Sequence, residues 1–534
     1  MTNSIAEIEQ AKVLLVIGSN TTEAHPVISY YMKRAHRRGA VLIVCDPRRI
    51  DLCRWADIHV QHRIGSDIAL VNGLMHEIIE QGWADLEFIE AHTEGFEEFR
   101  AAVARYPVER ASEITGVSPD LIRRVARVLG EAESAAVYYT LGITEHVSGT
   151  ANVMALANLQ MLLGNLGRPG TGLNPLRGQN NVQGACDMGA LPNVYHDYQR
   201  VDDPQVAAKF ERAWGRPGLS RTLGRTLPSM MAGLEDGSLR ALYVFGENIM
   251  MSEPNSAHTA ARLAAADLVI VNDIFENETT AFADVVFPAT SWPEVEGTFT
   301  STERRVQRVR RALDPPGEAR DDWWIFAELS RRLGYDLGCT SPAQIWEELR
   351  ELGTSYRGIT WERCEDVGVQ WPAPTPGHPG TPYLHAAGHF VRGRGRFMPT
   401  EWVPPAEQPN ADYPLVLSTG RRLWHYETGT QTRRAGGFEQ VLGEELIEIN
   451  PDDATQLGVV DGEMVRVSSR RGSVAVRARV TDHSPPGVCW MALHFHEASA
   501  NVLTTEAGDP VTGTPELKHC AIRVDRLPAG GGPR

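Results

Sequence analysis

The chain has 534 residues, 42% of them hydrophobic, and a formal net charge of −16. This length predicts about three or four domains, each large enough to bury its own hydrophobic core. The acidic balance argues against nucleic acid or an anionic membrane as the main partner of the surface. No window is apolar for long enough to span a membrane, so we expect no membrane span.

Seven cysteines are scattered along the chain without a Cys-x-x-Cys pair. An odd, dispersed set is not a disulfide framework, and its spacing does not match zinc or iron–sulfur ligands. We therefore expect no metal ligand among these cysteines. A reduced, cytoplasmic compartment is the expected location.

The first part of the chain has the pattern of a parallel α/β unit. Residues 13–18 and 40–46 are short apolar runs, and helical periodicity covers about residues 27–38 between them. Residues 135–143 predict a further strand, and residues 151–163 predict a long apolar helix. Ligands bind at the carboxyl ends of strands in such sheets, so we expect one crevice there. Its predicted lining is Gly18, Ser19, Asn20, Asp46, Pro47 and Arg48, with Asp67 nearby.

A second unit repeats this plan. Residues 241–250 and 268–275 are predicted strands on either side of a helix over 256–266. Each unit ends its second strand on an acidic residue, Asp46 or Asp273, which suggests two related nucleotide-sized sites. From residue 413 onward, short alternating strands predict an all-β module of about 120 residues that closes into a small barrel.

Residues 166–190 read LGRPGTGLNPLRGQNNVQGACDMGA and are too polar for a core element. Their glycines allow the backbone to approach a ligand closely, and amide side chains surround Arg177. This composition favours an anion-binding loop, and a hydrated surface connection is the alternative. The chain has no P-loop, no G-x-S-x-G and no H-E-x-x-H. A large polar ligand held by many dispersed contacts fits better than a nucleophile-based site.

Several segments, in this order, resemble the catalytic subunits of molybdenum or tungsten formate dehydrogenases in the dimethyl sulfoxide reductase family. They are VIGSNTTEAHP, VCDPRR, MLLGNLGRPGTGLNPLRGQNNVQGACDMGALP, FGENIM, VNDIF, LSTGRRLWHYETGTQTRR and TPELKHCAIRV. The resemblance covers essentially the whole chain, and RGQNNVQGACDMG is typical of the formate dehydrogenase branch. It implies two Rossmann-like α/β domains followed by a double-psi β-barrel, holding two molybdopterin guanine dinucleotides. The implied domains are residues 1–179 with 321–395, residues 180–320, and residues 396–534.

The resemblance also implies roles for individual residues. The residues expected to hold one dinucleotide are Gly18, Asn20, Asp46, Arg48 and Asp67. Those expected near the metal are Gly142, Thr144, Arg177 and Gln179. Those expected to hold the other dinucleotide are Gly246, Glu247, Asn248, Asp273, Ala289 and Asp322. Barrel residues expected to close over both are Thr419, Arg421, His425, Tyr426, Asn501 and Lys518. Two positions depart from the family pattern: Glu145 replaces an amide and Leu517 replaces a tyrosine.

Formate would be held as an anion, and a planar guanidinium can grip both carboxylate oxygens in one orientation. Arg177 matches the family residue with that role, and a structural salt bridge is the alternative. The redox chemistry itself would belong to the cofactor. For His146, His425 and His494, a hydrogen-bonded cleft histidine and a proton-transfer group both remain open.

In the family, a selenocysteine or cysteine followed by histidine binds the metal, and an iron–sulfur cluster carries the electrons away. Both lie upstream of the part that matches here. We therefore expect an N-terminally truncated catalytic subunit that does not oxidise formate alone. Its expected partners are the missing segment or electron-transfer subunits. One hypothesis is that an in-frame UGA codon was read as a stop, so that translation was assigned from Met1. The alternatives are a non-catalytic cofactor-binding subunit and a related family member without molybdenum.

Overall fold

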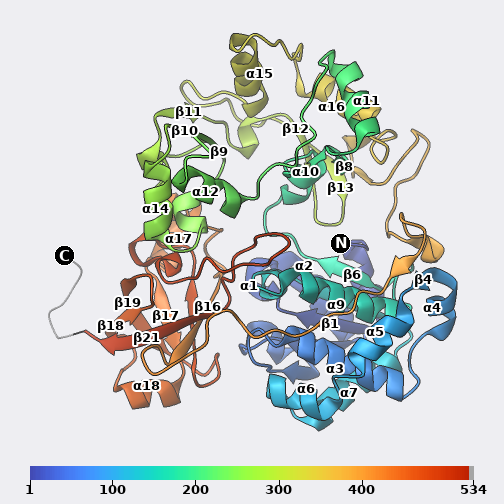
Figure 1. Cartoon of the computed structure of the whole chain (residues 1–534), viewed down its shortest axis with the longest axis vertical. Coiled ribbons are helices and arrows are strands. Elements are labelled where there is room, and N and C mark those ends of the chain that lie inside the picture. Colours follow the sequence, from blue (N-terminus) through green and yellow to red (C-terminus); the bar gives the residue numbers. More distant parts are fainter. Residues whose placement is uncertain (528–534) are drawn as a thin grey trace. The chain divides into compact units, whose positions relative to one another are not determined.

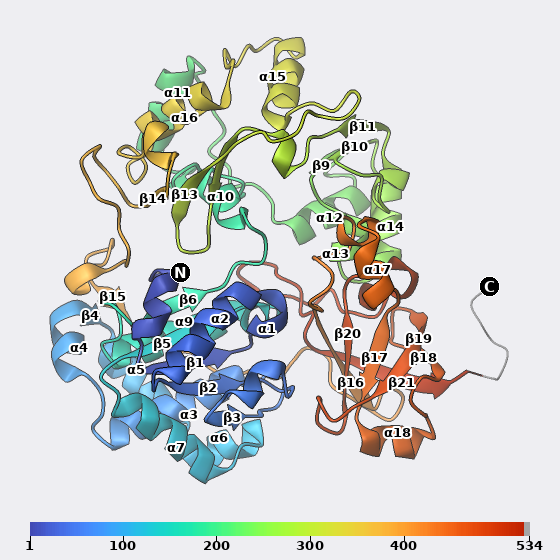
Figure 2. The same ribbon diagram turned by 180° about the vertical axis from the view of Figure 1, so that it is seen from behind.

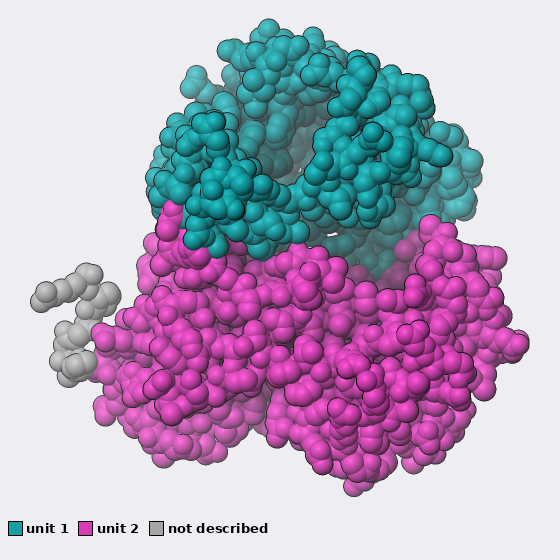
Figure 3. Space-filling view, viewed as in Figure 1, with its two compact units in different colours: residues 1, 177–247, 262–382 teal, residues 2–176, 248–261, 383–534 magenta. Residues whose placement is uncertain are grey.

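The computed structural model describes residues 1–527, which form two compact units (Figures 1 and 3). Unit 1 contains residue 1 with residues 177–247 and 262–382. Unit 2 contains residues 2–176, 248–261 and the chain from 383 onward. This division is coarser than the three predicted domains, whose boundaries stay a prediction. Within residues 1–527, no helix is long and apolar enough to cross a membrane.

Unit 2 begins with a five-stranded parallel sheet in the order β3-β2-β1-β5-β6. Its strands are β1 (Val13–Ile17), β2 (Val41–Cys45), β3 (Ile58–Val60), β5 (Ala135–Tyr139) and β6 (Gly172–Pro175). Every residue of β1 and β5 is buried. Apolar runs of this kind form strands because helices cover both faces of a parallel sheet. The predicted α/β unit is confirmed.

The helices of this layer are α1 (Thr21–Ala24), α2 (Pro26–Arg37), α3 (Asp67–Glu80), α4 (Leu86–His92), α5 (Phe96–Val103), α6 (Val108–Thr115), α7 (Pro119–Gly130), α8 (Leu141–Thr144) and α9 (Gly149–Leu162). Among them, α2 and α9 correspond to the helices predicted over about residues 27–38 and 151–163. The strand predicted for 135–143 ends earlier, at Tyr139. The chain turns there into α8, where the Gly142 N–H donates to the Gly18 carbonyl at 3.1 Å. The short strands β4 (Thr93–Glu94) and β15 (Gly395–Arg396) pair in parallel.

The predicted barrel is also confirmed and belongs to unit 2. Six strands close in the order β16-β20-β17-β19-β18-β21. Their bounds are β16 (Leu415–Gly420), β17 (Leu446–Ile449), β18 (Met464–Ser468), β19 (Ser473–Val480), β20 (Val488–Ala492) and β21 (Cys520–Arg526), and the helices beside them are α17 (Gly437–Val441) and α18 (Pro451–Leu457). Burial alternates along β16, because every second side chain points into the barrel core.

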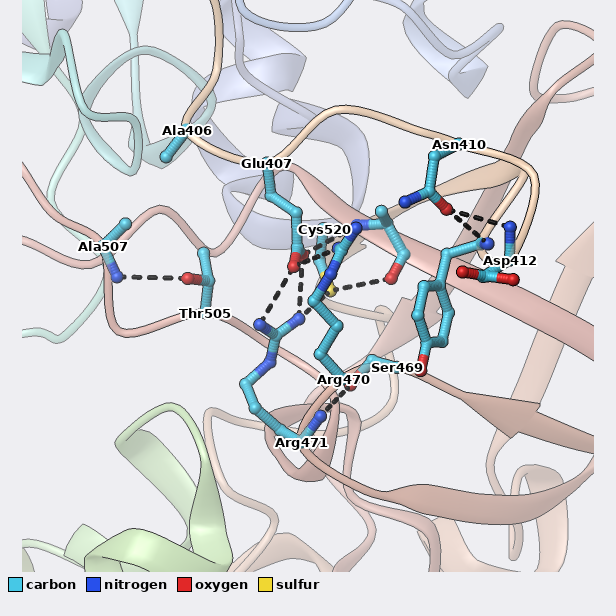
Figure 4. Close-up of polar contacts among 12 residues, drawn as sticks. Ala406, Glu407, Asn410, Asp412, Ser469, Arg470, Arg471, Thr505, Ala507 and Cys520 are labelled. Carbon is cyan, nitrogen blue, oxygen red and sulfur yellow. Dashed lines mark hydrogen bonds and ion pairs between the residues drawn. The ribbon is translucent and has the colours of Figure 1, made fainter.

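A connecting segment before β16 ties the two parts of unit 2 together. At one end, the Trp402 indole N–H donates to the Gly65 carbonyl at 2.9 Å. At the other end, Glu407 binds the barrel, as Figure 4 shows: its Oε2 lies 2.8 Å from Arg471 Nη2 and 3.0 Å from the Ala521 N–H. Burial opposes ionisation of Glu407, but Arg471 outweighs it and lowers the pKa to about 2. Glu407 is therefore ionised, and its ion pair with Arg471 attaches this segment to the barrel.

Unit 1 contains the second predicted α/β unit, with a three-stranded parallel sheet in the order β11-β10-β9 (Figure 2). Its strands are β9 (Ala241–Phe245), β10 (Leu268–Asp273) and β11 (Val285–Pro288). The strand predicted for 241–250 is shorter, because Gly246 has φ +62° and the chain then enters α13 (Ile249–Ser252). The helix α14 (Ser256–Ala264), predicted for 256–266, spans the boundary between the two units.

The rest of unit 1 is a smaller antiparallel sheet with helices beside it. Its strands are β12 (Gly297–Thr300), β13 (Arg305–Val309) and β14 (Val369–Gln370). The hairpin β7 (Val194–Tyr195) and β8 (Gln199–Arg200) forms a separate two-stranded sheet. Its helices are α10 (Val182–Asp187), α11 (Pro204–Trp214), α12 (Leu227–Glu235), α15 (Asp322–Arg332) and α16 (Pro342–Leu352).

Candidate cofactor and substrate site

Gly18 and Gly142, both predicted site residues, meet at the carboxyl ends of β1 and β5. Gly18 follows β1 with φ +57°, and its carbonyl accepts the Gly142 N–H at 3.1 Å and the Thr140 hydroxyl at 2.9 Å. A Cβ on Gly18 would lie 2.7 Å from the Gly142 carbonyl carbon. Two backbones approach here more closely than side chains allow. This close contact fixes the turns after β1 and β5, at the place where α/β sheets bind ligands.

Polar side chains surround these strand ends. Asp46 Oδ1 accepts the Arg48 N–H at 2.8 Å, and burial raises the Asp46 pKa against the opposing effect of Arg48. Beside these strand ends, Ser19 Oγ, Thr21 Oγ1 and Arg48 Nε are buried and lack a hydrogen-bond partner among the described residues. Unsatisfied buried polar groups are rare and costly, so these atoms suit a polar ligand.

Two further predicted residues frame this region. Asn20 lies just before α1, and its Oδ1 accepts the Thr22 hydroxyl at 2.9 Å. Asp67 opens α3, and its Oδ1 lies 2.9 Å from His62 Nε2. Burial opposes ionisation of Asp67, but His62 outweighs it and lowers the Asp67 pKa. Asp67 is therefore a carboxylate held by a histidine.

Arg48 has a barrel partner that sequence reasoning missed. Glu448 in β17 lies 2.7 Å from Arg48 Nη2 and 3.1 Å from Arg422 Nη1. Both guanidinium groups lie over the Trp490 ring, 3.9 and 4.5 Å from its centroid. Burial opposes ionisation of Glu448, but a hydrogen bond from His483 and the two arginines hold its pKa well below the usual range. The sequence signal that could have identified Glu448 is its position as the single acidic residue in the otherwise apolar run LIEI of β17.

Lys518 and Glu145 form a buried ion pair, with Nζ and Oε2 2.7 Å apart. Burial lowers the Lys518 pKa, while Glu145 opposes that effect. Lys518 also donates to the Thr419 carbonyl at 3.1 Å, and the Thr419 hydroxyl donates to the Leu517 carbonyl at 2.8 Å. Three predicted residues thus come together in unit 2, because Thr144 directly precedes Glu145. Glu145, which replaces an amide of the family pattern, supplies the counter-charge for Lys518.

The loop after β16 carries the remaining predicted barrel residues. Arg421 Nη2 lies 2.7 Å from Glu427 Oε2, and His425 Nε2 lies 2.7 Å from the Leu442 carbonyl. Tyr426 is exposed, and its N–H donates to the Thr432 hydroxyl at 3.1 Å. Contacts within the loop therefore fix the positions of Arg421, His425 and Tyr426, the residues expected to bind the cofactor.

Asn501 lies elsewhere in the barrel and is fully buried. Its Nδ2 donates to the carbonyl oxygens of Met251 and Ser252 at 2.7 and 3.1 Å. The side chain therefore anchors the carboxyl end of α13 to the barrel. A cofactor contact by Asn501 stays a prediction, and it would require these hydrogen bonds to be exchanged.

His494 has the geometry of a neutral histidine. Its Nε2 accepts the Arg422 N–H at 2.9 Å, and its Nδ1 donates to the Glu427 carbonyl. Burial lowers the His494 pKa to about 3. The hydrogen-bonded interpretation therefore fits His494 better than proton transfer. His146 Nε2 similarly contacts the Gly142 carbonyl, at 3.1 Å.

Arg177 lies in unit 1 and is held by an amide, as its surroundings in the sequence predict. Its Nε donates to Gln183 Oε1 at 3.3 Å, and its backbone N–H donates to the Thr302 hydroxyl at 3.2 Å. Gln183 Nε2 in turn donates to buried Asp187 Oδ1 at 2.7 Å. Gln179, two residues after Arg177, is exposed.

Asp187 is a second residue that sequence reasoning missed. Besides Gln183, it accepts hydrogen bonds from Tyr198 Oη at 2.7 Å, from Trp371 Nε1 at 2.8 Å and from the Tyr356 hydroxyl. Burial raises the Asp187 pKa, and these four donors oppose that shift. The Asp187 carboxylate therefore fixes the orientation of the Gln183 side chain, which in turn positions the Arg177 guanidinium.

The second predicted crevice follows the strands of unit 1. Gly246 leaves open space, because nothing lies within 4 Å of a Cβ built on it. Asp273 Oδ2 accepts Asn277 Nδ2 at 2.9 Å, and Asp322 at the start of α15 accepts Asn272 Nδ2 at 2.9 Å. Burial raises the Asp322 pKa. The remaining predicted members beside these strand ends are Glu247 after Gly246 and Ala289 after β11.

Asn248 lies on the other side of the boundary between the units. It belongs to unit 2, where its Nδ2 donates to the Thr430 hydroxyl at 3.3 Å. Over residues 1–527, no group of three or more histidine, cysteine, aspartate or glutamate side chains is arranged to hold a metal ion.

Comparison with known proteins agrees with this architecture. Residues 1–332 match the family described as molybdopterin oxidoreductase, and residues 415–521 match the molydopterin dinucleotide binding domain. The chain belongs to the molybdopterin oxidoreductase family. The barrel is thus this family's dinucleotide-binding domain, and the unsatisfied polar atoms beside the strand ends of unit 2 fit such a ligand.

Relatives extend over the whole chain. It is 45% identical to "F420-dependent formate dehydrogenase subunit alpha" of Methanocaldococcus jannaschii over 531 residues, 99% of this chain and 78% of the relative. It is 39% identical to "Formate dehydrogenase H" of Escherichia coli over 532 residues, 99% of this chain and 74% of the relative. Acetylene hydratase from Pelobacter acetylenicus shares the fold, with a TM-score of 0.74 at 19% identity, over 98% of this chain and 81% of that one.

Proposed function

We propose that this chain is the catalytic subunit of a formate dehydrogenase that oxidises formate to carbon dioxide. The observation that carries the proposal is the 45% identity to a formate dehydrogenase alpha subunit over 99% of the chain. The support from geometry is Arg177, a guanidinium in an amide-rich loop whose Nε donates to Gln183 Oε1 at 3.3 Å.

Arg177 binds and orients the substrate in this proposal. A carboxylate and a guanidinium are both planar, so two parallel hydrogen bonds fix the direction of the formate C–H bond. Gln183 limits rotation of the guanidinium through Nε, and Asp187 limits rotation of Gln183. Holding the reactant in one orientation lowers the entropic part of the barrier.

Oxidation of formate releases one proton and two electrons for each carbon dioxide formed. A bound molybdenum centre with two molybdopterin guanine dinucleotides supplies the two-electron acceptor. Each α/β unit holds one dinucleotide with its strand-end residues, and Thr419, Arg421 and Lys518 of the barrel are further cofactor-binding residues. Tungsten is the alternative metal.

The remaining parts of the proposal concern partners and location. An iron–sulfur cluster and the sulfur ligand of the metal come from a segment outside these 534 residues, and further subunits accept the electrons. A cytoplasmic location is supported by the seven cysteines, all of which are free thiols in the described part of the chain.

The test compares two arginine variants of the cofactor-loaded enzyme purified as its native assembly. Arg177→Lys keeps the charge but loses the planar two-point contact, so we expect the KM for formate to rise about 10- to 100-fold. Arg200→Lys is the matched control, because Arg200 is an exposed unit 1 arginine paired with Asp202. An unchanged KM in Arg177→Lys, at unchanged molybdenum content, would contradict the assigned role.

A further inference from the structure

Two cations that are predicted to bind the cofactor, Arg421 and Lys518, lie beside the carboxyl end of β16 in unit 2. Lys518 Nζ donates to the Thr419 carbonyl at 3.1 Å, and Arg421 follows Thr419 by two residues. Burial opposes ionisation of Arg421, but Glu427 and Glu145 outweigh it and raise the Arg421 pKa. Because Glu145 acts on both cations, Arg421, Lys518, Glu145 and Glu427 form one electrostatic unit, which we call the four-charge cluster.

Each cation of the cluster already has a carboxylate partner. Lys518 Nζ lies 2.7 Å from Glu145 Oε2. Arg421 Nη2 and Nε lie 2.7 and 3.2 Å from Glu427 Oε2. Two positive and two negative side chains leave the cluster without net charge. A single added anion would therefore bring an uncompensated charge into a poorly hydrated site, which is unfavourable.

The carboxylates of the cluster are held by fewer groups than the structural carboxylates of unit 2. Glu448 is shared by two arginines, and Glu407 accepts the Ala521 N–H in addition to its ion pair. Glu145 Oε2, in contrast, is buried without a hydrogen-bond partner among residues 1–527. Both contacts of Glu427 with its arginine use the same oxygen. Glu145 and Glu427 are therefore the carboxylates that an anionic ligand can replace at the lowest cost.

Glu427 also has an unusual backbone conformation. Its φ of +45° lies in the left-handed region that residues other than glycine rarely adopt, and its carbonyl accepts His494 Nδ1. Such strain is concentrated at ligand sites. The side chains of Arg421 and Glu427 are 19% and 23% exposed, whereas those of Lys518 and Glu145 are 10% and 9% exposed. An anion from solvent therefore reaches the cluster from the Glu427 side.

We propose that Glu145 and Glu427 are exchangeable counter-charges, which hold Arg421 and Lys518 in position and leave them when a diphosphate group binds. The proposal rests on the cofactor-binding role proposed above for the two cations. A diphosphate carries at least two negative charges and offers one phosphate group to each cation, so it replaces both carboxylates and keeps the cluster neutral. Formate carries one charge and replaces one carboxylate at most. The cluster therefore selects the diphosphate of a dinucleotide over the substrate anion.

Anion binding by the chain without metal or dinucleotide tests the exchange. The probe is inorganic pyrophosphate, titrated calorimetrically at constant ionic strength. We expect Glu145→Gln and Glu427→Gln each to bind pyrophosphate about ten-fold more tightly than the wild type, because a competing carboxylate is removed. Glu463→Gln is the control outside the cluster and should bind like the wild type. Unchanged or weaker binding by both cluster variants, or no binding by any of the proteins, would overturn the proposal.

Thermal unfolding separates exchange from a purely structural ion pair. Glu145→Gln leaves Lys518 buried without its counter-charge, so we expect a lower Tm than in the wild type. Pyrophosphate should raise the Tm of this variant more than that of the wild type, because a ligand stabilises the state that binds it. Adding Lys518→Met to Glu145→Gln should remove this extra rise. A Tm that pyrophosphate does not restore would show a structural ion pair and overturn the proposal.

Formate competition tests the selectivity. We expect formate to displace pyrophosphate poorly from the wild type and about ten-fold better from Glu145→Gln, in which one cation has lost its carboxylate. Equal displacement from the two proteins would overturn the selective role of Glu145. These measurements use neither the metal nor formate oxidation, so failure here is distinct from failure of the proposed function.

Discussion

Arg48 Nη2 lies 2.7 Å from Glu448 Oε2, so a buried ion pair joins residues that are 400 positions apart. The pair links the first α/β sheet of unit 2 to its barrel, and Arg422 shares the same carboxylate. Glu448→Gln leaves two buried arginines without a counter-charge, so we expect the free energy of unfolding to fall by about 3–5 kcal/mol.

Urea denaturation of the whole chain checks this value. Glu463→Gln is the control, because it removes a carboxylate whose partner Arg526 is well exposed. We expect that control to change the unfolding free energy by less than about 1 kcal/mol. Equal losses in the two variants would show that the shared carboxylate has no special structural role.

Glu445 makes the stability of the barrel depend on pH. Burial raises its pKa from 4.5 to about 7, with an opposing contribution from Arg422. A carboxyl group with a raised folded-state pKa binds more protons in the folded state, so stability is highest below pH ~4.5 and falls as the pH rises to ~7. The loss above that pH is about 3 kcal/mol.

Glu445→Gln removes this ionisation. The side-chain oxygen of glutamine can still accept the N–H groups of Leu446 and Ala492, both 3.0 Å from Glu445 Oε1. We expect the variant to be more stable than the wild type at pH 8 and equally stable at pH 4.5, measured by denaturation across that range. A difference that does not change with pH would exclude Glu445 as its source.

Gly18 tests the close approach at the strand ends. Gly18→Ala places a methyl group 2.7 Å from the Gly142 carbonyl carbon in addition to the cost of φ +57°. Gly82→Ala is the matched control, because Gly82 has φ +72° and no atom within 4 Å of an added Cβ. We expect Gly18→Ala to lose about 1–3 kcal/mol more stability than the control. Equal losses would mean that only backbone conformation matters there.

Asp187 tests how Arg177 is positioned. Asp187→Asn cannot accept all four hydrogen bonds, so Gln183 loses its fixed orientation and Arg177 loses its support. We expect the KM for formate to rise about ten-fold, with a smaller change in kcat. Tyr356→Phe removes another donor to Asp187 without touching Gln183, and it should leave the KM unchanged. A KM that shifts equally in both would indicate general loosening of the loop.

Local patterns predicted most of the architecture. The apolar runs at β1, β2, β9 and β10 and the alternating run at β16 identified both α/β units and the barrel, because each depends on neighbouring residues alone. The amide partner of Arg177 was also predictable, since Gln183 is six residues away.

Contacts between distant residues could not be predicted in the same way. The early end of β5 depends on the contact of Gly142 with Gly18, and the role of Asp187 depends on Tyr356 and Trp371, more than 160 positions away. Glu145 departs from the family pattern, and its role as counter-charge depends on the distant Lys518. The partners of buried charges are set by the tertiary fold, and the periodicity of the sequence carries no information about such long-range contacts.

Formate turnover by the cofactor-loaded native assembly tests the central claim most directly. With ¹³C-formate and an artificial electron acceptor, the account predicts ¹³C-carbon dioxide and acceptor reduction in a one-to-one ratio of molecules to electron pairs. It also predicts that Arg177→Lys requires far more formate for the same rate. An assembly that contains molybdenum and guanine dinucleotide but neither releases ¹³C-carbon dioxide nor reduces the acceptor would contradict it.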